Sequence, residues 1–378
     1  MYHVKTMNKI SKIGLAELDD RFAISDTMEH EDAILVRSAK LHDYDFPAEL
    51  KCIARAGAGV NNIPLDRAAD AGIVVFNAPG ANANGVKELT IAALLLASRK
   101  ISQGITWVKE QSAAGADVAA VVEKGKAAYV GPEIMGKTLG VVGLGAIGVL
   151  VANAAAALGM KIVGYDPFLS VTHALNLTPG VEVVDTLPEL YAKADYISLH
   201  LPMNDATRGT LNEAAFAAMK DGVRIVNLAR GELVDTPALK AALESGKCAA
   251  YVTDFPNSET AAMEGVVAIP HLGASTPESE DNCAMMAARE VKEYLDNGSI
   301  INSVNLPNLT MAWAAKTRVC VISKGADAAA IAGAVPAVAS ASNTRGAYAY
   351  TILDTDAAVD EAAIAAIPGV LRVRVLTR

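Results

Sequence analysis

Short, continuous apolar runs alternate with helical segments along the first 90 residues. The runs at 33–36, 52–54 and 73–76 contain no polar residue, which is typical of parallel strands buried on both faces. The segments 47–50 and 65–69 between these runs have the composition of helices. The pattern predicts a small α/β unit that ends near residue 90.

A second α/β series begins at Thr138. Its strand candidates are 138–142, 161–165, 195–199, 223–228, 249–253 and 266–269. Segment 86–108, which is apolar on one side and free of proline, is predicted to be helical and to link the two series. Repeated β–α alternation predicts an open, doubly wound parallel sheet with helices on both faces.

Residues 275–297 are predicted to form a helix that returns the chain to the first series. Ser275 or Thr276 is a suitable N-cap, Pro277 suits the first helical position, and Gly298 follows the end. The predicted domains are therefore a discontinuous one (1–90 with 276–306), a nucleotide-binding one (91–275) and a C-terminal one (316–378).

The C-terminal segment has a different pattern. Strands are predicted at 318–322, 338–342, 348–353 and 370–376, with helices at 326–334 and 359–367. The order βαββαβ is that of a ferredoxin-like module.

Composition excludes several classes of protein. The chain has 378 residues, 52% of them hydrophobic, and a net charge of −9, which argues against nucleic-acid and anionic-membrane partners. The four cysteines are far apart with no CxxC pair, which favours reduced thiols over disulfides or a metal site.

The N-terminus has no signal-peptide pattern and the longest apolar run, 91–97, is too short to span a bilayer. We expect a soluble, cytoplasmic protein.

The strand candidate at 138–142 leads into Gly143-Leu-Gly145-Ala-Ile-Gly148. Such a triplet between a strand and a helix allows a tight turn, close approach of a pyrophosphate and close packing of the helix. Asp166 ends the next strand, 18 residues after Gly148, where an acid receives the ribose 2′-hydroxyl. The arrangement predicts a dinucleotide site. Asp166 favours NAD, because a 2′-phosphate would meet its negative charge.

Three polar residues follow later strands of the same series: Arg230, Glu259 and His271. Each alone is more often a surface or capping residue, but ligands bind beyond the carboxyl ends of strands in such sheets. A histidine removes the hydroxyl proton during hydride transfer, a carboxylate stabilises the imidazolium, and an arginine binds a substrate carboxylate bidentately. The set therefore predicts oxidation of a 2-hydroxy acid or reduction of a 2-oxo acid.

Over residues 1 to about 305 the sequence resembles the D-isomer-specific 2-hydroxyacid dehydrogenases. The resemblance rests on the glycine triplet, His200-Leu-Pro202, Asn227-Leu-Ala-Arg-Gly-Glu-Leu-Val-Asp235 and Pro270-His-Leu-Gly-Ala-Ser-Thr276. Glu280-Asp-Asn-Cys-Ala284, Val36-Arg-Ser38 and Arg55-Ala-Gly-Ala-Gly-Val-Asn61 point to members with a phosphorylated substrate. The resemblance implies a flavodoxin-like fold for the discontinuous domain, and Arg230, Glu259 and His271 as catalytic residues.

The same resemblance implies which residues contact NAD. They are Gly143, Gly145, Ala146, Ile147, Gly148, Asp166, His200, Leu201, Pro202, Leu228, Ala229, Arg230, Asp254, His271, Gly273 and Ala274. Asp254 matches the family's acid near the nicotinamide amide.

The substrate phosphate requires cations from the first series. Arg37 and Arg55 each end a strand, and Ser38, Ala58 and Gly59 lie beside them. Lys87 stands where the family usually has a small residue, near the start of a predicted helix that could hold an anion. A solvated or ion-paired surface position is the alternative for each cation.

Two other functions remain open. A hydroxypyruvate or glyoxylate reductase of the same family would need neither the cations nor the C-terminal module. A non-enzymatic, nucleotide-sensing corepressor would not need Arg230, Glu259 and His271, and the acidic net charge also disfavours it.

The C-terminal module resembles an ACT domain, with Ile367-Pro-Gly-Val-Leu-Arg-Val373 as the best local match. It departs from that pattern after its first strand, where Ser323-Lys-Gly-Ala-Asp327 replaces the Pro-Gly pair at which an amino-acid effector binds. The departure disfavours effector binding and favours a role in assembly. The resemblance implies a homodimer or homotetramer.

Overall fold

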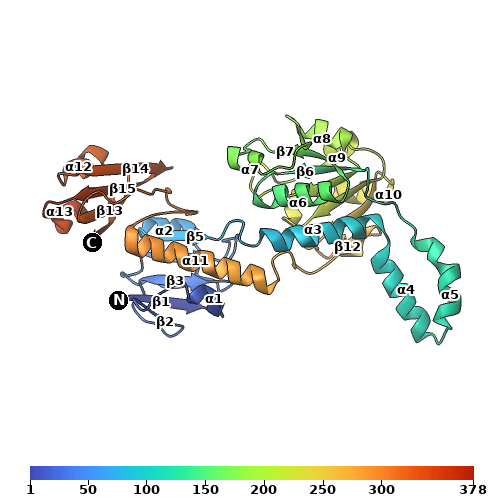
Figure 1. The fold of residues 1–378 in the computed structure, drawn as a ribbon, viewed down its shortest axis with the longest axis horizontal. Coiled ribbons are helices and arrows are strands. Elements are labelled where there is room, and N and C mark those ends of the chain that lie inside the picture. Colours follow the sequence, from blue (N-terminus) through green and yellow to red (C-terminus); the bar gives the residue numbers. More distant parts are fainter. The chain divides into compact units, whose positions relative to one another are not determined.

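The computed structural model describes all 378 residues, which form two compact units. One comprises Met1–Asn82 with Pro277–Arg378, and the other comprises Ala83–Thr276. Figure 1 shows the elements of both units. The binding roles predicted for the domains 1–90 with 276–306, 91–275 and 316–378 stay predictions. No helix has the length and apolar character needed to cross a membrane.

The unit Ala83–Thr276 is built on a seven-stranded parallel sheet in the order β12-β11-β10-β9-β6-β7-β8. Its strands are β6 (Thr138–Val142), β7 (Lys161–Tyr165), β8 (Glu182–Val183), β9 (Tyr196–Leu199), β10 (Val223–Asn227), β11 (Cys248–Thr253) and β12 (Val266–Ala268). The strand order reverses between β6 and β9, which is the topological switch point of a doubly wound fold. The predicted Rossmann sheet is confirmed, and β8 is a strand that the sequence pattern did not predict.

Helices cover both faces of this sheet (Figure 1). One core joins the sheet to α3 (Ala83–Ser98) and α6 (Ala146–Ala157), and the other joins it to α8 (Leu187–Lys193), α9 (Glu213–Ala218) and α10 (Thr236–Glu244). Strand residues such as Val141, Ile225 and Val252 are fully buried. Burial on both faces explains why these strands are continuous apolar runs. The remaining helices of the unit are α4 (Ile101–Ala113), α5 (Val118–Gly125), α7 (Val171–Leu175) and the 3₁₀ turns η1 (Lys126–Tyr129), η2 (Gly231–Leu233) and η3 (Thr260–Ala262).

The helix predicted over 86–108 is interrupted. α3 ends at Ser98 and α4 begins at Ile101. Ser98 is held by hydrogen bonds to Leu94 O and to the hydroxyl of Tyr196 on β9, both at 2.8 Å. The end of α3 thus coincides with a tertiary contact to β9.

The first part of the other unit is a five-stranded parallel sheet in the order β2-β1-β3-β4-β5, which is flavodoxin-like. Its strands are β1 (Tyr2–Met7), β2 (Phe22–Ser25), β3 (Ala33–Val36), β4 (Cys52–Arg55) and β5 (Val74–Asn77), with helices α1 (Lys12–Leu15) and α2 (Leu65–Asp70). The helix predicted at 47–50 is wrong, because the segment is a single turn closed by Leu50 N–H donating to Pro47 O at 3.0 Å.

The predicted helix after residue 275 is α11 (Pro277–Asn297), which begins at the proline and is followed by Gly298 with φ of +70°. α11 packs on the five-stranded sheet through residues such as Ala287, Val291 and Tyr294. The chain therefore returns to this sheet, and the fold is discontinuous in sequence as expected.

The C-terminal segment forms an antiparallel sheet in the order β14-β15-β13-β16. Its elements are β13 (Thr317–Lys324), α12 (Ala328–Gly333), β14 (Ala339–Arg345), β15 (Tyr348–Thr355), α13 (Glu361–Ala365) and β16 (Val370–Thr377). The predicted ferredoxin-like βαββαβ module is confirmed.

This module binds the carboxyl end of α11. The last carbonyls of a helix have no partner within the helix, and here Arg374 donates to Tyr294 O and Leu295 O at 2.9 and 2.8 Å. Tyr350 donates to Gly298 O at 2.6 Å, and Cys320, Ile322 and Ile352 join the core of the five-stranded sheet. Cationic donors also suit the negative end of the helix dipole. The module and α11 are thus one packed structure.

Candidate active site

The turn between β6 and α6 places its three glycines in different environments. Gly143 has φ of +93°, and a Cβ there would lie 2.6 Å from His200 O. A Cβ on Gly148 would lie 1.9 Å from Gly143 O, so the helix packs directly on the turn. A Cβ on Gly145, the N-cap of α6, would meet no atom within 4 Å. The turn is therefore closely packed at two glycines and open at the third, where helix N–H groups can receive a phosphate.

Asp166 lies beside this turn at the end of β7. Its Oδ2 accepts a hydrogen bond from Leu144 N–H at 2.9 Å, and its Oδ1 accepts one from Phe168 N–H at 2.8 Å. The two bonds fix the carboxylate next to the glycine turn, at the position from which an acid binds the ribose of a dinucleotide.

Asp254 follows β11 and is 1% exposed. Its Oδ2 accepts a hydrogen bond from Gly273 N–H at 3.0 Å, whereas its buried Oδ1 has no partner. Burial raises the pKa of this carboxyl, while the Gly273 N–H and the nearby His271 oppose the increase. A buried acceptor without a donor costs about 1–3 kcal/mol. The site therefore fits a ligand that supplies an N–H, as the carboxamide of a nicotinamide does.

Arg230 and His271 both contact one aromatic ring, that of Phe255. The Arg230 guanidinium carbon is 5.3 Å from the centroid of the Phe255 ring, and the centroids of Phe255 and His271 are 4.3 Å apart. The His271 side chain is exposed, and Arg230 is half-buried. Cation–π and ring–ring contacts position both groups, and Arg230 Nη1 also donates to Ala229 O at 2.6 Å.

The other unit carries the predicted phosphate ligands at the carboxyl ends of β3 and β4. Arg37 Nη2 lies 2.5 Å from Glu280 Oε1, and Arg55 Nε donates to Arg37 O at 3.1 Å. The N–H groups of Ser38 and Ala39 donate to the Asn8 side chain at 2.9 and 2.7 Å. The two guanidinium groups therefore lie at the carboxyl edge, beside the switch point between β1 and β3.

The NAD-binding segment has a known family. Residues 91–273 match the family model described as D-isomer specific 2-hydroxyacid dehydrogenase, NAD binding domain. The chain belongs to the D-isomer specific 2-hydroxyacid dehydrogenase family. The unit that contains the glycine turn is thus an NAD-binding domain.

Relatives of known name and structure support this family. The D-3-phosphoglycerate dehydrogenase of Methanocaldococcus jannaschii is 35% identical over 315 residues, which is 81% of this chain and 58% of that protein. The structure of NAD⁺-bound 3-phosphoglycerate dehydrogenase from Entamoeba histolytica is 26% identical with a TM-score of 0.62, covering 82% of this chain and 99% of that one. A glyoxylate reductase structure from Paecilomyes thermophila is 28% identical with a TM-score of 0.66, and the match covers 80% of this chain and 98% of that one. The chain spans little more than half the length of the curated relatives that it matches.

The other family residues predicted to contact NAD occupy the same carboxyl edge of the sheet. Ala146 and Ile147 form the first turn of α6, Leu201 and Pro202 follow His200 after β9, and Leu228 and Ala229 follow β10. Ala274 follows Gly273. His200 Nε2 is 2.9 Å from Ser198 Oγ, and desolvation lowers its pKa to about 4. This imidazole is therefore neutral at pH 7, and its contact with NAD stays a prediction.

Glu259 is placed differently from the family's supporting acid. Its side chain is exposed and lines a cavity with Lys240, Leu243 and Gly265. The Asn257 side chain fixes the turn by accepting from Glu259 N–H and Thr260 N–H at 3.0 and 2.8 Å. No hydrogen bond or ion pair joins Glu259 to His271 in this conformation, so their pairing stays a prediction.

Lys87 lies on α3, in the NAD-binding unit, and its Nζ is 3.5 Å from Glu88 Oε1. Its side chain is 23% exposed. The role predicted for it in binding a phosphate, like those of Ala58 and Gly59, stays a prediction.

Sequence reasoning missed Asn227 and Phe255. Asn227 is fully buried, donates to Arg230 O at 2.8 Å and to the Tyr251 hydroxyl at 3.1 Å, and accepts from Ala229 N–H at 3.1 Å. It therefore shapes the turn that presents Arg230. An asparagine as the last residue of an apolar strand is the signal that could have indicated this role.

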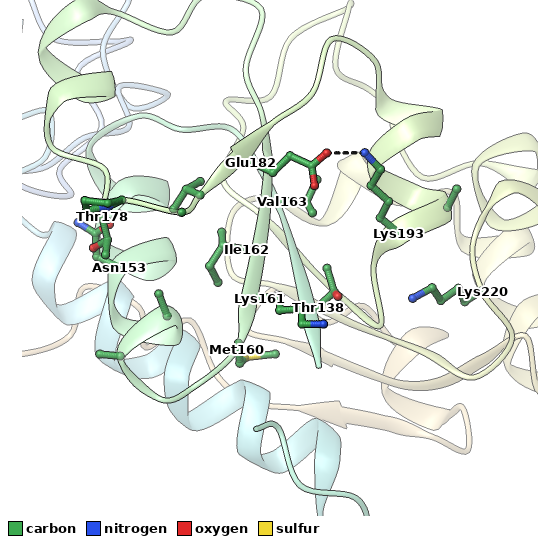
Figure 2. A pocket seen from close by; sticks show the side chains of 16 residues that line it. Thr138, Asn153, Met160, Lys161, Ile162, Val163, Thr178, Glu182, Lys193 and Lys220 are labelled. Carbon is green, nitrogen blue, oxygen red and sulfur yellow. Dashed lines mark hydrogen bonds and ion pairs between the residues drawn. The ribbon is translucent and has the colours of Figure 1, made fainter. Parts of the chain in front are cut away.

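A large cavity lies at the opposite edge of the same sheet (Figure 2). Thr138 and Lys161, the first residues of β6 and β7, line it together with Lys193 and Lys220. Lys193 is 2.5 and 2.9 Å from Glu182 and Glu189, and Lys220 is 3.0 Å from Asp195. The cavity therefore lies at the amino ends of β6 and β7, away from the NAD-binding edge.

Proposed function

We propose that the chain oxidises 3-phospho-D-glycerate to 3-phosphohydroxypyruvate with NAD, the first step of L-serine biosynthesis. The observation that carries the proposal is the unpartnered Asp254 Oδ1, on the same sheet edge as Arg230, His271 and the open glycine turn. The names of the relatives support the choice of a phosphorylated substrate. Arg37 and Arg55 supply the cations that such a substrate requires.

The proposed roles follow from the chemistry of each side chain. His271 accepts the hydroxyl proton of the substrate at a ring nitrogen, and Phe255 positions its ring. Arg230 binds the substrate carboxylate through its guanidinium fork. Asp254 and the Gly143–Gly148 turn hold NAD, which when bound accepts the hydride.

Glu259 would support His271 only after the turn at 257–260 moves its carboxylate to the imidazole. A carboxylate there favours the imidazolium and so raises the histidine pKa. If the pairing forms during catalysis, Glu259→Gln should shift the pH profile of kcat and leave the KM for NAD unchanged. An unchanged profile would remove Glu259 from the mechanism.

The direct test is NADH oxidation by the full chain with phosphohydroxypyruvate, hydroxypyruvate and glyoxylate. We expect kcat/KM for phosphohydroxypyruvate to exceed that for hydroxypyruvate by at least about a hundredfold, since charge-assisted hydrogen bonds contribute roughly 1.5–3 kcal/mol each. Arg37→Ala and Arg55→Ala should reduce this ratio. Equal kcat/KM values of the wild type for phosphohydroxypyruvate and hydroxypyruvate would favour the alternative, a hydroxypyruvate or glyoxylate reductase. The similarity to a glyoxylate reductase structure is the reason for testing this alternative.

A nucleotide-sensing corepressor is the alternative without catalysis. Arg230→Gln should abolish dehydrogenase activity if the chain is an enzyme. If Arg230→Gln leaves the function in cells intact, the enzymatic proposal fails.

We also propose a cytoplasmic homodimer or homotetramer without nucleic-acid partners. The four free, buried cysteines support a cytoplasmic location. The net charge of −9 supports the absence of nucleic-acid partners. Light scattering of the full chain would show whether it is a dimer or a tetramer.

A further inference from the structure

A separate cavity of about 440 Å³ lies in the unit formed by Met1–Asn82 and Pro277–Arg378. Its walls include Gly80, Met285, Met286, Glu290, Ile301 and Asn302. The volume is within the range of small-molecule sites. None of these residues belongs to the proposed active site.

Glu290 is the unusual feature of this cavity. It projects from α11 and is only 6% exposed. Its Oε1 accepts a hydrogen bond from Asn302 Nδ2 at 2.7 Å, whereas its buried Oε2 has no partner. Desolvation raises the pKa of this carboxyl to about 8, against the smaller opposing effect of Asn302. A buried carboxyl with one free oxygen costs folding free energy unless a ligand satisfies it.

The Asn302 amide is held in place by its backbone. Asn302 has φ of +59°, a left-handed conformation that asparagine tolerates better than most residues. Its carbonyl accepts from Asn77 N–H at 3.4 Å. The Glu290–Asn302 bond is therefore part of a fixed wall, and it leaves the second carboxyl oxygen for another partner.

The charged groups around Glu290 leave no cation for that oxygen. Arg289 is bound by Glu17, at 2.8 and 3.0 Å from its two carboxylate oxygens. Glu293 is acidic itself and accepts from Asn297 Nδ2 at 2.6 Å. The walls from the turns at 80–81 and 301–302 bring no charged side chain. The remaining lining consists of the polar, uncharged Asn282 and the apolar side chains of Met285, Met286 and Ile301.

We propose that this cavity binds a primary ammonium group carried on a short apolar chain. The ammonium donates to Glu290 Oε2, and the chain packs on Met285, Met286 and Ile301. An ammonium ion binds the ionised carboxyl, so Glu290 releases its proton to solvent when the ligand binds. This site does not depend on the proposed dehydrogenase function.

The test is calorimetric titration of the full chain with n-butylammonium chloride at pH 7.5, with 1-butanol as the uncharged comparison. We expect saturable binding of the cation, with binding of the alcohol weaker by at least about tenfold, which corresponds to roughly 1.4 kcal/mol. Glu290→Gln should weaken cation binding by a similar factor. Glu278→Gln, at an exposed position in the first turn of the same helix, should not change it.

Repeating the titration in buffers of different ionisation enthalpy measures the released proton directly. Wild type should release a proton at pH 7.5, and Glu290→Gln should release none. Ile301→Lys, at a position 42% exposed, would supply a tethered ammonium and should block binding even if Glu290→Gln does not fold. Equal affinity in wild type and Glu290→Gln, equal binding of the alcohol, or no saturable binding by folded wild type would each overturn the proposal.

Discussion

Asp254 accepts a hydrogen bond from the backbone N–H of Gly273 at 3.0 Å and leaves its other carboxylate oxygen buried without a donor. This bond joins the loop after β11 to the segment that carries His271. One oxygen of Asp254 therefore orders the protein, and the other is available to a ligand. A side chain used only for structure would have both oxygens satisfied.

Asp254→Asn is expected to weaken binding of NADH by about tenfold to a hundredfold, because hydrogen bonds to charged groups contribute roughly 1.5–3 kcal/mol. The amide still accepts from Gly273 and retains the shape of the side chain. NADH fluorescence titration measures the effect. Asp221→Asn is a matched control, because Asp221 forms only an exposed ion pair with Lys247. Unchanged affinity in Asp254→Asn would mean that the free oxygen does not face the cofactor.

Asp166 is expected to make the protein select NAD over NADP. The carboxylate is held beside the glycine turn by two backbone N–H groups, and a 2′-phosphate at about 4 Å would be repelled by roughly 4 kcal/mol at an effective dielectric constant of 20. We expect kcat/KM for NAD to exceed that for NADP by at least about a hundredfold. Asp166→Asn should reduce the ratio of kcat/KM for NAD to kcat/KM for NADP. Comparable use of both cofactors by wild type would contradict the assignment.

The strands of the NAD-binding sheet were predictable because burial on both faces requires continuous apolar runs. β6, β7, β10 and β11 are confirmed on this basis. β1 mixes polar and apolar residues in Tyr2–Met7, and β8 has only two residues, so neither is a continuous apolar run. Ser98, the last residue of α3, contacts the Tyr196 hydroxyl, which is distant in sequence.

The candidate site was predictable in its residue types more than in its contacts. The glycines and Asp166 have a characteristic spacing, because the turn, α6 and β7 set their positions. The contacts of Phe255 with Arg230 and His271, and the free oxygen of Asp254, arise from the packing of three separate loops. The exposed position of Glu259 follows from a local turn that the family pattern did not reveal.

Glu290 is expected to make the free energy of unfolding depend on pH. Burial raises its pKa from 4.5 to about 8 in the folded state, so the folded chain holds a proton that the unfolded chain loses above its lower pKa. Stability relative to Glu290→Gln should therefore fall as the pH rises from about 4.5 to 8, by on the order of a few kcal/mol. Urea unfolding of both proteins across this range measures the difference. If the free energies of unfolding of the wild type and Glu290→Gln change with pH in parallel, Glu290 is not buried in its neutral form.

Two ion pairs on β13 should differ greatly in their contribution to stability. Asp354 binds Arg318 bidentately at 2.7 and 2.9 Å with both side chains fully buried, and Arg318 also donates to Asn297 O at the end of α11. Asp354→Asn would leave a buried guanidinium without its counter-ion, a loss of about 3–5 kcal/mol.

The matched control is Asp70→Asn, which breaks the exposed pair with Lys324 and should cost about 1 kcal/mol or less. Urea unfolding of the full chain compares the two variants. Because Arg318 and Arg374 bind α11, the Asp354 variant should lower the stability of the five-stranded sheet as well as that of the C-terminal module. If hydrogen exchange showed only the module destabilised, the module would be an independent domain.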